Sequence, residues 1–290
     1  MPSPLSREDV IAVVAGRYPG FFATLSVEAP PSLALAAYVM EGLDGVDIAC
    51  AERYCGFLAY LVERAAASEA PLDRMRALGL VLGDEEGYRG DTEDYDHPRN
   101  SSVSQVMGRR RGLPITLSVL YLSVAEHLGW PLVGIDFPGR FLVRYTQGDE
   151  LLVADPFDGG RLLTFEACVE LAQPFLGRLP QAHLRTQVRV RLDGLCGPRR
   201  IAQRMLGNLA GSFERRDDDD GLRNVLEKLL LLDTGPLGPW RSLGEVYARG
   251  GEAPLALACL HRYLDHAVQV EDRAAVHAII ARLERQAGEA

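Results

Sequence analysis

The sequence contains a single lysine, Lys228, so arginine supplies nearly all of its positive charge. The formal net charge is −9, from 40 acidic and 31 basic residues. A chain with this balance is a poor general binder of nucleic acid, which attracts clustered basic residues. Composition therefore disfavours nucleic acid as a partner and leaves local arginine clusters as the exception to consider.

A membrane segment and an export signal are also lacking. No uninterrupted apolar run reaches the roughly 20 residues that a spanning helix needs. Residues 1–20 carry charges at positions 7–9, where an export signal has an apolar core. The sequence therefore predicts a cytoplasmic protein that does not associate with a membrane.

Metal-binding and disulfide patterns are missing as well. The five cysteines are an odd number and are widely scattered, at positions 50, 55, 168, 196 and 259. Cys50 and Cys55 have no histidine nearby, which suits helix packing better than a metal site. We expect reduced thiols, and we predict no metal and no cofactor.

Helical periodicity dominates the first part of the chain. Ser6 is placed to cap a first helix, with Asp9 three residues later. Further on, residues 84–96 carry seven acidic residues and two glycines, which predicts a loop. The predicted helices cover residues 6–16, about 30–41, 48–67 and 72–82.

The middle of the chain predicts a buried helix followed by strands. Residues 113–128 are apolar on nearly all sides, with Pro114 in the first turn and Gly129 after the last. Strand-like runs cover 132–137, 141–145 and 151–154, with a turn at 146–149. A buried helix that leads into antiparallel strands is an α+β arrangement.

From about residue 198 the pattern is helical again, with short linkers. The alternation resembles stacked helix pairs of the tetratricopeptide type, in two or three degenerate units. The predicted helices cover residues 199–214, 222–232, 240–249, 254–267 and 272–287.

Four motifs in a fixed order carry a resemblance to a known family. They are YDHPRNS at 95–101, RRGLPITLS at 110–118, FPGRFLVR at 137–144 and DPFDGG at 155–160. Together they resemble the SirB1-type transglutaminase-like family over roughly residues 70–180. That family combines a transglutaminase-like core with C-terminal tetratricopeptide-like helices, which residues 204–209 (RMLGNL) match more loosely.

The resemblance implies an α+β fold with a papain/transglutaminase-like core, in which a buried helix packs on an antiparallel sheet. We expect a helical segment at 1–70 that packs on this core. The core itself is expected at 71–190, and the tetratricopeptide-like helical segment at 191–290.

The resemblance also bears on chemistry, because the wider superfamily uses a Cys-His-Asp triad with the cysteine at the start of the buried helix. Matched by motif, Pro114 occupies the position of the nucleophile, Arg140 that of the base and Asp155 that of the acid. Proline offers no nucleophile, and arginine stays protonated and cannot act as a general base. We therefore predict a degenerate triad in which Arg140 and Asp155 form an ion pair.

Other residues near these positions are candidates for lining the cleft of such a fold. His97 is the best alternative base, although it lies in a loop, where a surface role is usual. Asn100 and Ser101 are expected to organise the cleft wall through hydrogen bonds, and Thr116 to pack within the buried helix. The full candidate set is Tyr95, His97, Asn100, Ser101, Thr116 and Asp155.

Residues 175–204 hold seven arginines and one acidic residue, Asp193. They could bind an acidic partner, or they could pair within the chain, with the acidic loop at 84–96. We favour pairing because no aromatic residue is interleaved with them, as single-strand binding requires. The candidate partner-binding residues are Arg185, Arg189, Arg191, Arg199 and Arg200.

These patterns favour a non-catalytic protein that acts as an interaction or scaffolding module, with another protein as its partner. The degenerate cleft, the C-terminal helices or both would supply the surface. One alternative is an amide hydrolase or transglutaminase-like enzyme with a relocated site that uses Asp155 and His97. A second is the binding of an acidic macromolecule through the arginine-rich face. The oligomeric state is left open.

Overall fold

The structure is a computed structural model that describes residues 5–19, 45–148, 150–266 and 272–289. The chain forms two compact units. One, here called the core unit, is Ala29–Met205. The other, here called the helical unit, combines Met1–Glu28 with Leu206–Ala290.

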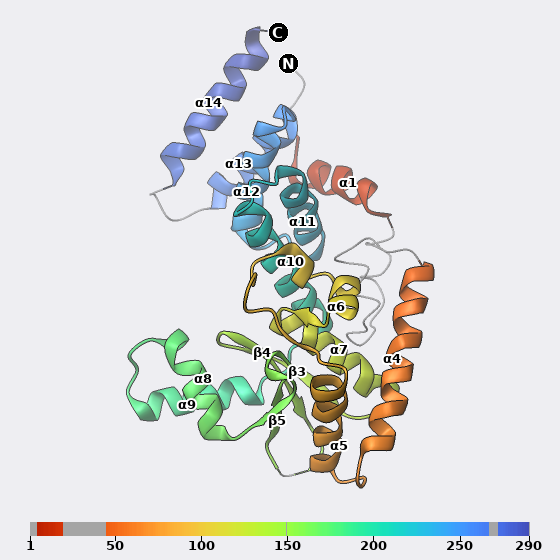
Figure 1. Cartoon of the computed structure of the whole chain (residues 1–290). Coiled ribbons are helices and arrows are strands. Elements are labelled where there is room, and N and C mark those ends of the chain that lie inside the picture. Colours follow the sequence, from red (N-terminus) through yellow and green to blue (C-terminus); the bar gives the residue numbers. More distant parts are fainter. Residues whose placement is uncertain (1–4, 20–44, 149, 267–271, 290) are drawn as a thin grey trace. The chain divides into compact units, whose positions relative to one another are not determined.

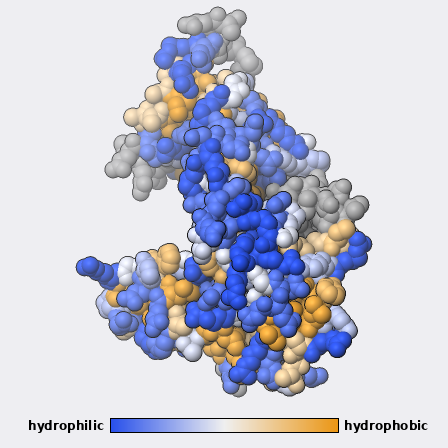
Figure 2. All heavy atoms as spheres, in the orientation of Figure 1, coloured by the Kyte–Doolittle hydropathy of each residue, from blue (hydrophilic) through white to orange (hydrophobic). Residues whose placement is uncertain are grey.

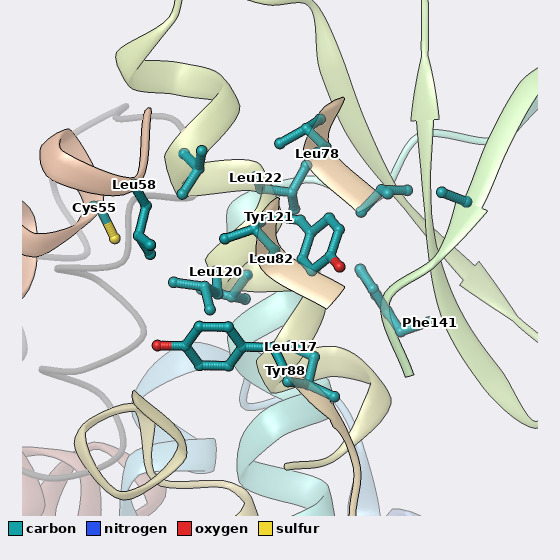
Figure 3. Close-up of a cluster of buried hydrophobic side chains, with 14 of the residues drawn as sticks. Cys55, Leu58, Leu78, Leu82, Tyr88, Leu117, Leu120, Tyr121, Leu122 and Phe141 are labelled. Atoms are coloured by element: carbon teal, nitrogen blue, oxygen red, sulfur yellow. The ribbon is translucent and has the colours of Figure 1, made fainter. Parts of the chain in front are cut away.

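Helix α7, Pro114–His127, is the centre of the core unit. Its first twelve residues are all buried, as the nearly continuous apolar pattern predicts. Pro114 is the first helical residue, where its missing N–H costs nothing, and Gly129 follows the helix with a φ of 64°. Figure 3 shows Leu120 and Tyr121 of α7 surrounded by buried side chains of other segments.

A four-stranded antiparallel sheet packs against α7 in the order β3-β4-β5-β6. Side chains that alternate along β4 face two different clusters: Phe141 and Val143 join α7, whereas Leu142 joins α8. Burial on both faces explains why these strands read as nearly continuous apolar runs. The strands are β3 Leu132–Phe137, β4 Arg140–Tyr145, β5 Leu152–Asp155 and β6 Arg161–Leu163.

The predicted strands β3, β4 and β5 are present, and β6 is an addition that the sequence pattern did not predict. Two helices were also not predicted, α8 Phe165–Leu176 and α9 Gln181–Asp193. They pack on each other, and their buried side chains form a second apolar cluster with the sheet (Figure 1). The sheet is therefore covered on both faces, which completes an α+β core.

The remaining elements of the core unit are helical or very short. Helix α5 continues directly into the π-helical segment η1, so the predicted helix at 72–82 extends into the predicted acidic loop. The rest of that loop holds the two-residue strand β1, which pairs in parallel with β2. The bounds are α4 Gly45–Ala65, α5 Pro71–Leu78, η1 Gly79–Glu85, β1 Arg89–Gly90, η2 Pro98–Asn100, α6 Val103–Arg109, β2 Arg111–Gly112 and η3 Pro156–Asp158.

The helical unit contains the N-terminal helix together with the C-terminal ones. Ser6 caps α1 and forms a capping box with Asp9, as predicted. The five predicted C-terminal helices are present with small shifts at their ends. The helix expected at about 30–41 lies outside the described residues. The bounds are α1 Arg7–Arg17, α10 Pro198–Glu214, α11 Asp219–Leu232, α12 Leu237–Arg249, α13 Ala253–His266 and α14 Arg273–Glu289.

The expected segments 1–70, 71–190 and 191–290 do not coincide with these units. Helix α1 packs on α11 and α13, because its buried Val10 and Val14 match an apolar surface there. Helix α4 instead packs on α7 of the core unit. The unit boundary after Met205 lies within α10.

Within the described residues, no helix combines the length and apolar character that crossing a bilayer requires. Hydrophobic side chains do reach the surface in places, and Figure 2 shows them over α4 and near α8. The exposed aromatic residues there are Phe57 and Tyr60 on α4 and Phe175 on α8.

Candidate functional site

Asp155 ends strand β5 and caps the short helix η3. Its side chain is 3% exposed, and its Oδ1 accepts a hydrogen bond of 3.0 Å from the Phe157 N–H. The Asp-Pro-Phe sequence favours this turn for two reasons. Proline fixes the φ of the first helical residue, and the aspartate carboxylate accepts a hydrogen bond from the backbone N–H two residues later. The backbone N–H of Phe157 thus fixes the carboxylate at the end of the sheet.

Arg140 begins the neighbouring strand β4 and contacts this carboxylate. Its Nε donates to Asp155 Oδ2 at 3.3 Å, and its Nη1 donates to the Gly139 carbonyl at 3.0 Å. The guanidinium carbon also lies 4.6 Å from the centre of the Phe157 ring, a cation–π distance. The ion pair that the sequence predicts is therefore present; we call it the Arg140–Asp155 site.

Burial affects the pKa of Asp155 more than the attraction of Arg140 does. Burial raises the pKa of the Asp155 carboxyl above its ordinary value, although Arg140 and the Phe157 N–H oppose the shift. Arg140 is 27% exposed, so solvent screens the pair in part. The Arg140 guanidinium lies against the carboxylate and accepts no proton, so Arg140 itself cannot act as a general base.

Pro114 lies at the start of α7 and is buried. Helix α7 packs on β4 and on η3, and Ser118 Oγ in its second turn donates to the Phe141 carbonyl at 2.8 Å. Thr116 is also buried, and its hydroxyl has no hydrogen-bond partner in the described part of the chain. The start of this helix therefore presents a buried proline ring.

The buried thiols of the described chain do not supply a substitute nucleophile. Four are buried, and burial raises their pKa, to about 11 for Cys168 and Cys196 and to about 12 for Cys55 and Cys259. The negative charge of Asp155 raises the pKa of Cys168 further. These thiols are protonated at neutral pH, whereas the thiolate is the nucleophile.

The segment 95–101 is organised around Asn100, which is fully buried. Its Nδ2 donates to the carbonyls of Asp94 and Tyr95 at 2.7 and 3.2 Å, and its Oδ1 accepts from Arg109 Nη1 at 2.9 Å. Its own carbonyl accepts from the Leu113 N–H at 3.0 Å. Asn100 thus ties this segment to α6 through its side chain and to the residue that precedes α7 through its backbone carbonyl.

Another candidate in this segment, Tyr95, packs beside Phe157. Tyr95 is 43% exposed, and its ring meets the Phe157 ring edge-on at 6.0 Å. Burial of the hydroxyl raises the Tyr95 pKa, and the positive charges of Arg140 and Arg204 oppose that shift. The aromatic and charged groups around Arg140 therefore come from three separate parts of the sequence.

His97 and Ser101 serve the backbone of the short helix η2. His97 Nδ1 accepts from the Arg99 N–H at 3.1 Å, and the Ser101 N–H donates to the Pro98 carbonyl at 2.9 Å. The two oxygens of Asp155 accept from Arg140 and from the Phe157 N–H.

Glycines close the loop that follows Asp155. Gly159 and Gly160 have φ of 63° and 78°, and this turn lies directly on η1. A Cβ on Gly83 would lie 1.9 Å from the Gly159 carbonyl oxygen, and one on Gly90 would lie 2.3 Å from the Phe157 ring. Sequence reasoning missed this contact; the signal was the glycine pair Gly79 and Gly83, four apart in a helical pattern.

Several arginines form ion pairs within the chain, in part as predicted. Near α6, Arg109 and Arg110 bind Asp91 and Glu86 of the acidic segment at 2.9 and 2.8 Å.

Those of residues 175–204 use other acids, which corrects the predicted pairing with 84–96. Arg185 binds Glu166 at 2.5 Å, and Arg200 and Arg204 bind Asp136. Phe165 lies beneath Arg185 and Arg189, so an aromatic residue does accompany these arginines. Arg191 and Arg199 are exposed.

Replacing Asn100 by alanine should destabilise the core unit by about 2–3 kcal/mol, because the two carbonyls and the Arg109 guanidinium lose a buried partner. Urea unfolding at neutral pH measures the difference. Gln105→Ala, on the exposed side of α6, is the matched control and should change stability by less than about 0.5 kcal/mol. Equal stability of the two variants would contradict the role given to Asn100.

Comparison with known proteins places the site in a family. Residues 54–207 match the family model described as "Transglutaminase-like superfamily", and this match includes Pro114, Arg140 and Asp155. A UPF0162 protein of Xylella fastidiosa (strain Temecula1) is 38% identical over 192 residues, which are 66% of this chain and 67% of that protein.

Two other relatives match a smaller part of this chain. A UPF0162 protein of Pseudomonas aeruginosa is 36% identical over 181 residues, 62% of this chain and 61% of that protein. F-box only protein 21 of Homo sapiens is 33% identical over 161 residues, which are 53% of this chain and 24% of that protein.

Proposed function

Since the chain belongs to the transglutaminase-like superfamily and to the UPF0162 proteins, we propose that it is a non-catalytic member of SirB1 type that binds a partner protein. The observation that carries the proposal is the contact of Arg140 with Asp155 at 3.3 Å. An arginine in the position of the base removes the proton acceptor, and Pro114 removes the nucleophile. The fold is kept, and binding is the activity that remains available to it.

The proposed binding surface surrounds the Arg140–Asp155 site. Tyr95 and Arg140 are partly exposed there, and tyrosine and arginine are the residues most often enriched at protein interfaces. Helices α10 to α14, which we interpret as degenerate tetratricopeptide-like pairs, would supply further surface. The proposed setting is the cytoplasm, in keeping with five cysteines that form no disulfide.

No specific observation supports either alternative function. A relocated hydrolase site needs His97 beside Asp155, and the two residues bind different groups. An arginine face for acidic macromolecules needs available guanidinium groups, and Arg185 and Arg200 are engaged with Glu166 and Asp136. Protein binding at the degenerate site is therefore the function we propose.

A photo-crosslinking amino acid in place of Tyr95 tests this proposal in the full chain, expressed in bacterial cells. We expect an adduct of one defined mass, which weakens when Arg140→Glu is added. The matched control carries the same probe in place of Tyr60, an exposed tyrosine on α4. Equal adducts at both positions, or none at position 95, would count against the proposal.

A further inference from the structure

The helical unit buries a carboxylate that accepts hydrogen bonds from a separate part of the chain. Glu227 of α11 has a side chain that is 1% exposed. Its Oε1 accepts from Arg17 Nη1 and, at 2.7 Å, from the Tyr247 hydroxyl, while its Oε2 accepts from the Tyr18 hydroxyl at 2.7 Å. Two of these three donors are consecutive residues at the end of α1.

Neighbouring groups of the helical unit also contact Arg17 and Tyr18. Glu252 accepts from Arg17 Nη2 at 2.7 Å, and Asn224 Nδ2 donates to the Tyr18 hydroxyl at 3.1 Å. The ammonium of Lys228 lies 5.4 Å from the centre of the Tyr18 ring, and Lys228 is itself buried. The helical unit therefore carries a built acceptor site for an Arg–Tyr pair, with two carboxylates for the guanidinium.

The apolar contact of α1 with the helical unit consists of a few side chains at helical spacing. Val10 and Val14 are fully buried, one helical turn apart, and α1 packs on α11 and α13. Glu8, on the opposite side of α1, is exposed, and so is Val13 on its flank. A helix of 11 residues is marginal in water on its own, so its docking and its folding are coupled.

We propose that the surface of α11 and α13 around Glu227 is a recognition groove for a short amphipathic helix, and that α1 is the occupant supplied by the chain itself. The partner it fits is a protein helix with two β-branched residues four apart, followed three and four residues later by arginine and tyrosine. Such a partner binds by displacing α1. The groove belongs to the helical unit, so this inference does not depend on the function proposed for the Arg140–Asp155 site.

Charge provides the selectivity. A carboxylate as buried as Glu227 is costly without a cationic donor, so a helix in the groove is favoured when it places a cationic side chain, arginine in α1, at this position. Because α1 belongs to the same chain as the groove, its effective concentration there is on the order of millimolar, which hides the groove from weak partners. A competing helix succeeds by extending the apolar contact beyond the two valines.

The experiment uses the full chain with α1 weakened by Arg17→Ala and Tyr18→Phe, which leaves every groove residue unchanged. The probe is a fluorescein-labelled peptide with the sequence of residues 5–19. We expect micromolar binding to this variant and at least tenfold weaker binding to the wild-type chain. A peptide with alanine at the arginine position should not bind, and adding Glu227→Gln to the variant should abolish binding of the native peptide.

Lys228 supplies a second readout, because it is the only lysine and Tyr18 covers it. Acylation by an amine-reactive ester, mapped by mass spectrometry, should be slow in wild type, faster in the variant and slow again with the native peptide. If Arg17→Ala/Tyr18→Phe fails to fold, Val10→Ser/Val14→Ser weakens α1 from its apolar side and should give the same pattern.

Three results would overturn the proposal. The native peptide could bind wild type and both variants alike, or the alanine peptide could bind as tightly as the native one. A wild-type dimer that dissociates in the variants would assign the groove to α1 of a second copy instead of a partner protein.

Discussion

Replacing Gly83 by alanine is expected to lower the stability of the core unit by about 3 kcal/mol. The added Cβ would lie 1.9 Å from the Gly159 carbonyl oxygen and 2.6 Å from its carbon. Both are backbone atoms of the turn that follows Asp155, and they cannot move aside as a flexible side chain would. The turn must shift, and the Arg140–Asp155 contact should loosen with it.

Gly108→Ala is the matched control for this substitution. Gly108 lies in α6, and a Cβ added there would have no neighbouring atom within 4 Å. Alanine at this position should leave the fold intact and stabilise the helix by up to about 1 kcal/mol. Urea unfolding followed by Trp130 fluorescence, in a Trp240→Phe background that isolates the core unit, measures both variants. A Gly83→Ala chain as stable as its parent would refute the close packing of the turn.

Removing Arg140 is the second substitution with a strong effect on stability. Arg140→Ala leaves the Asp155 carboxylate buried with only the Phe157 N–H as a partner, and should cost about 3 kcal/mol at pH 7. The pKa of Asp155 is already raised by burial and should rise further without Arg140. Because protonation removes the unpaired charge, the defect should shrink as the pH falls towards and below that raised pKa.

A double variant separates charge from packing. Adding Asp155→Asn to Arg140→Ala keeps an oxygen for the Phe157 N–H and removes the charge, so it should recover at least half of the lost stability. Urea unfolding at pH 7 and pH 5 gives the comparison. If the double variant is no more stable than Arg140→Ala, or if the defect of Arg140→Ala does not depend on pH, the unpaired carboxylate is not its cause.

Much of the core could be predicted because its patterns are local. The apolar run 113–128, the strands of 132–155 and the Ser6 cap each follow from side chains within a few residues of one another. Strand β6 was missed because its three residues follow two glycines. Helix α8 was missed because it contains Pro174, which argues against a helix, and α9 because its arginines obscure its apolar face. The buried Leu184, Val188 and Leu192 of α9 do show the helical spacing.

The site was predictable where motifs fixed a position and not where it depended on distant contacts. The Arg140–Asp155 pair follows from matching two motifs to neighbouring strands. The partners of Arg185 and Arg200 could not be chosen from the sequence, because many acids were available and only tertiary packing selects Glu166 and Asp136. The docking of α1 on Glu227 joins residues more than 200 positions apart, beyond any local pattern.

Whether the Arg140–Asp155 site is catalytically inert is best decided by measuring turnover of amide substrates by the purified full chain, beside Asp155→Asn. Fluorogenic peptide amides and glutamine side-chain amides cover both hydrolysis and acyl transfer. We predict that wild type and Asp155→Asn give the same background, because in our proposal Arg140 and Pro114 occupy the positions of the base and the nucleophile. Turnover by wild type that Asp155→Asn abolishes, in a variant that remains folded, would contradict a non-catalytic site.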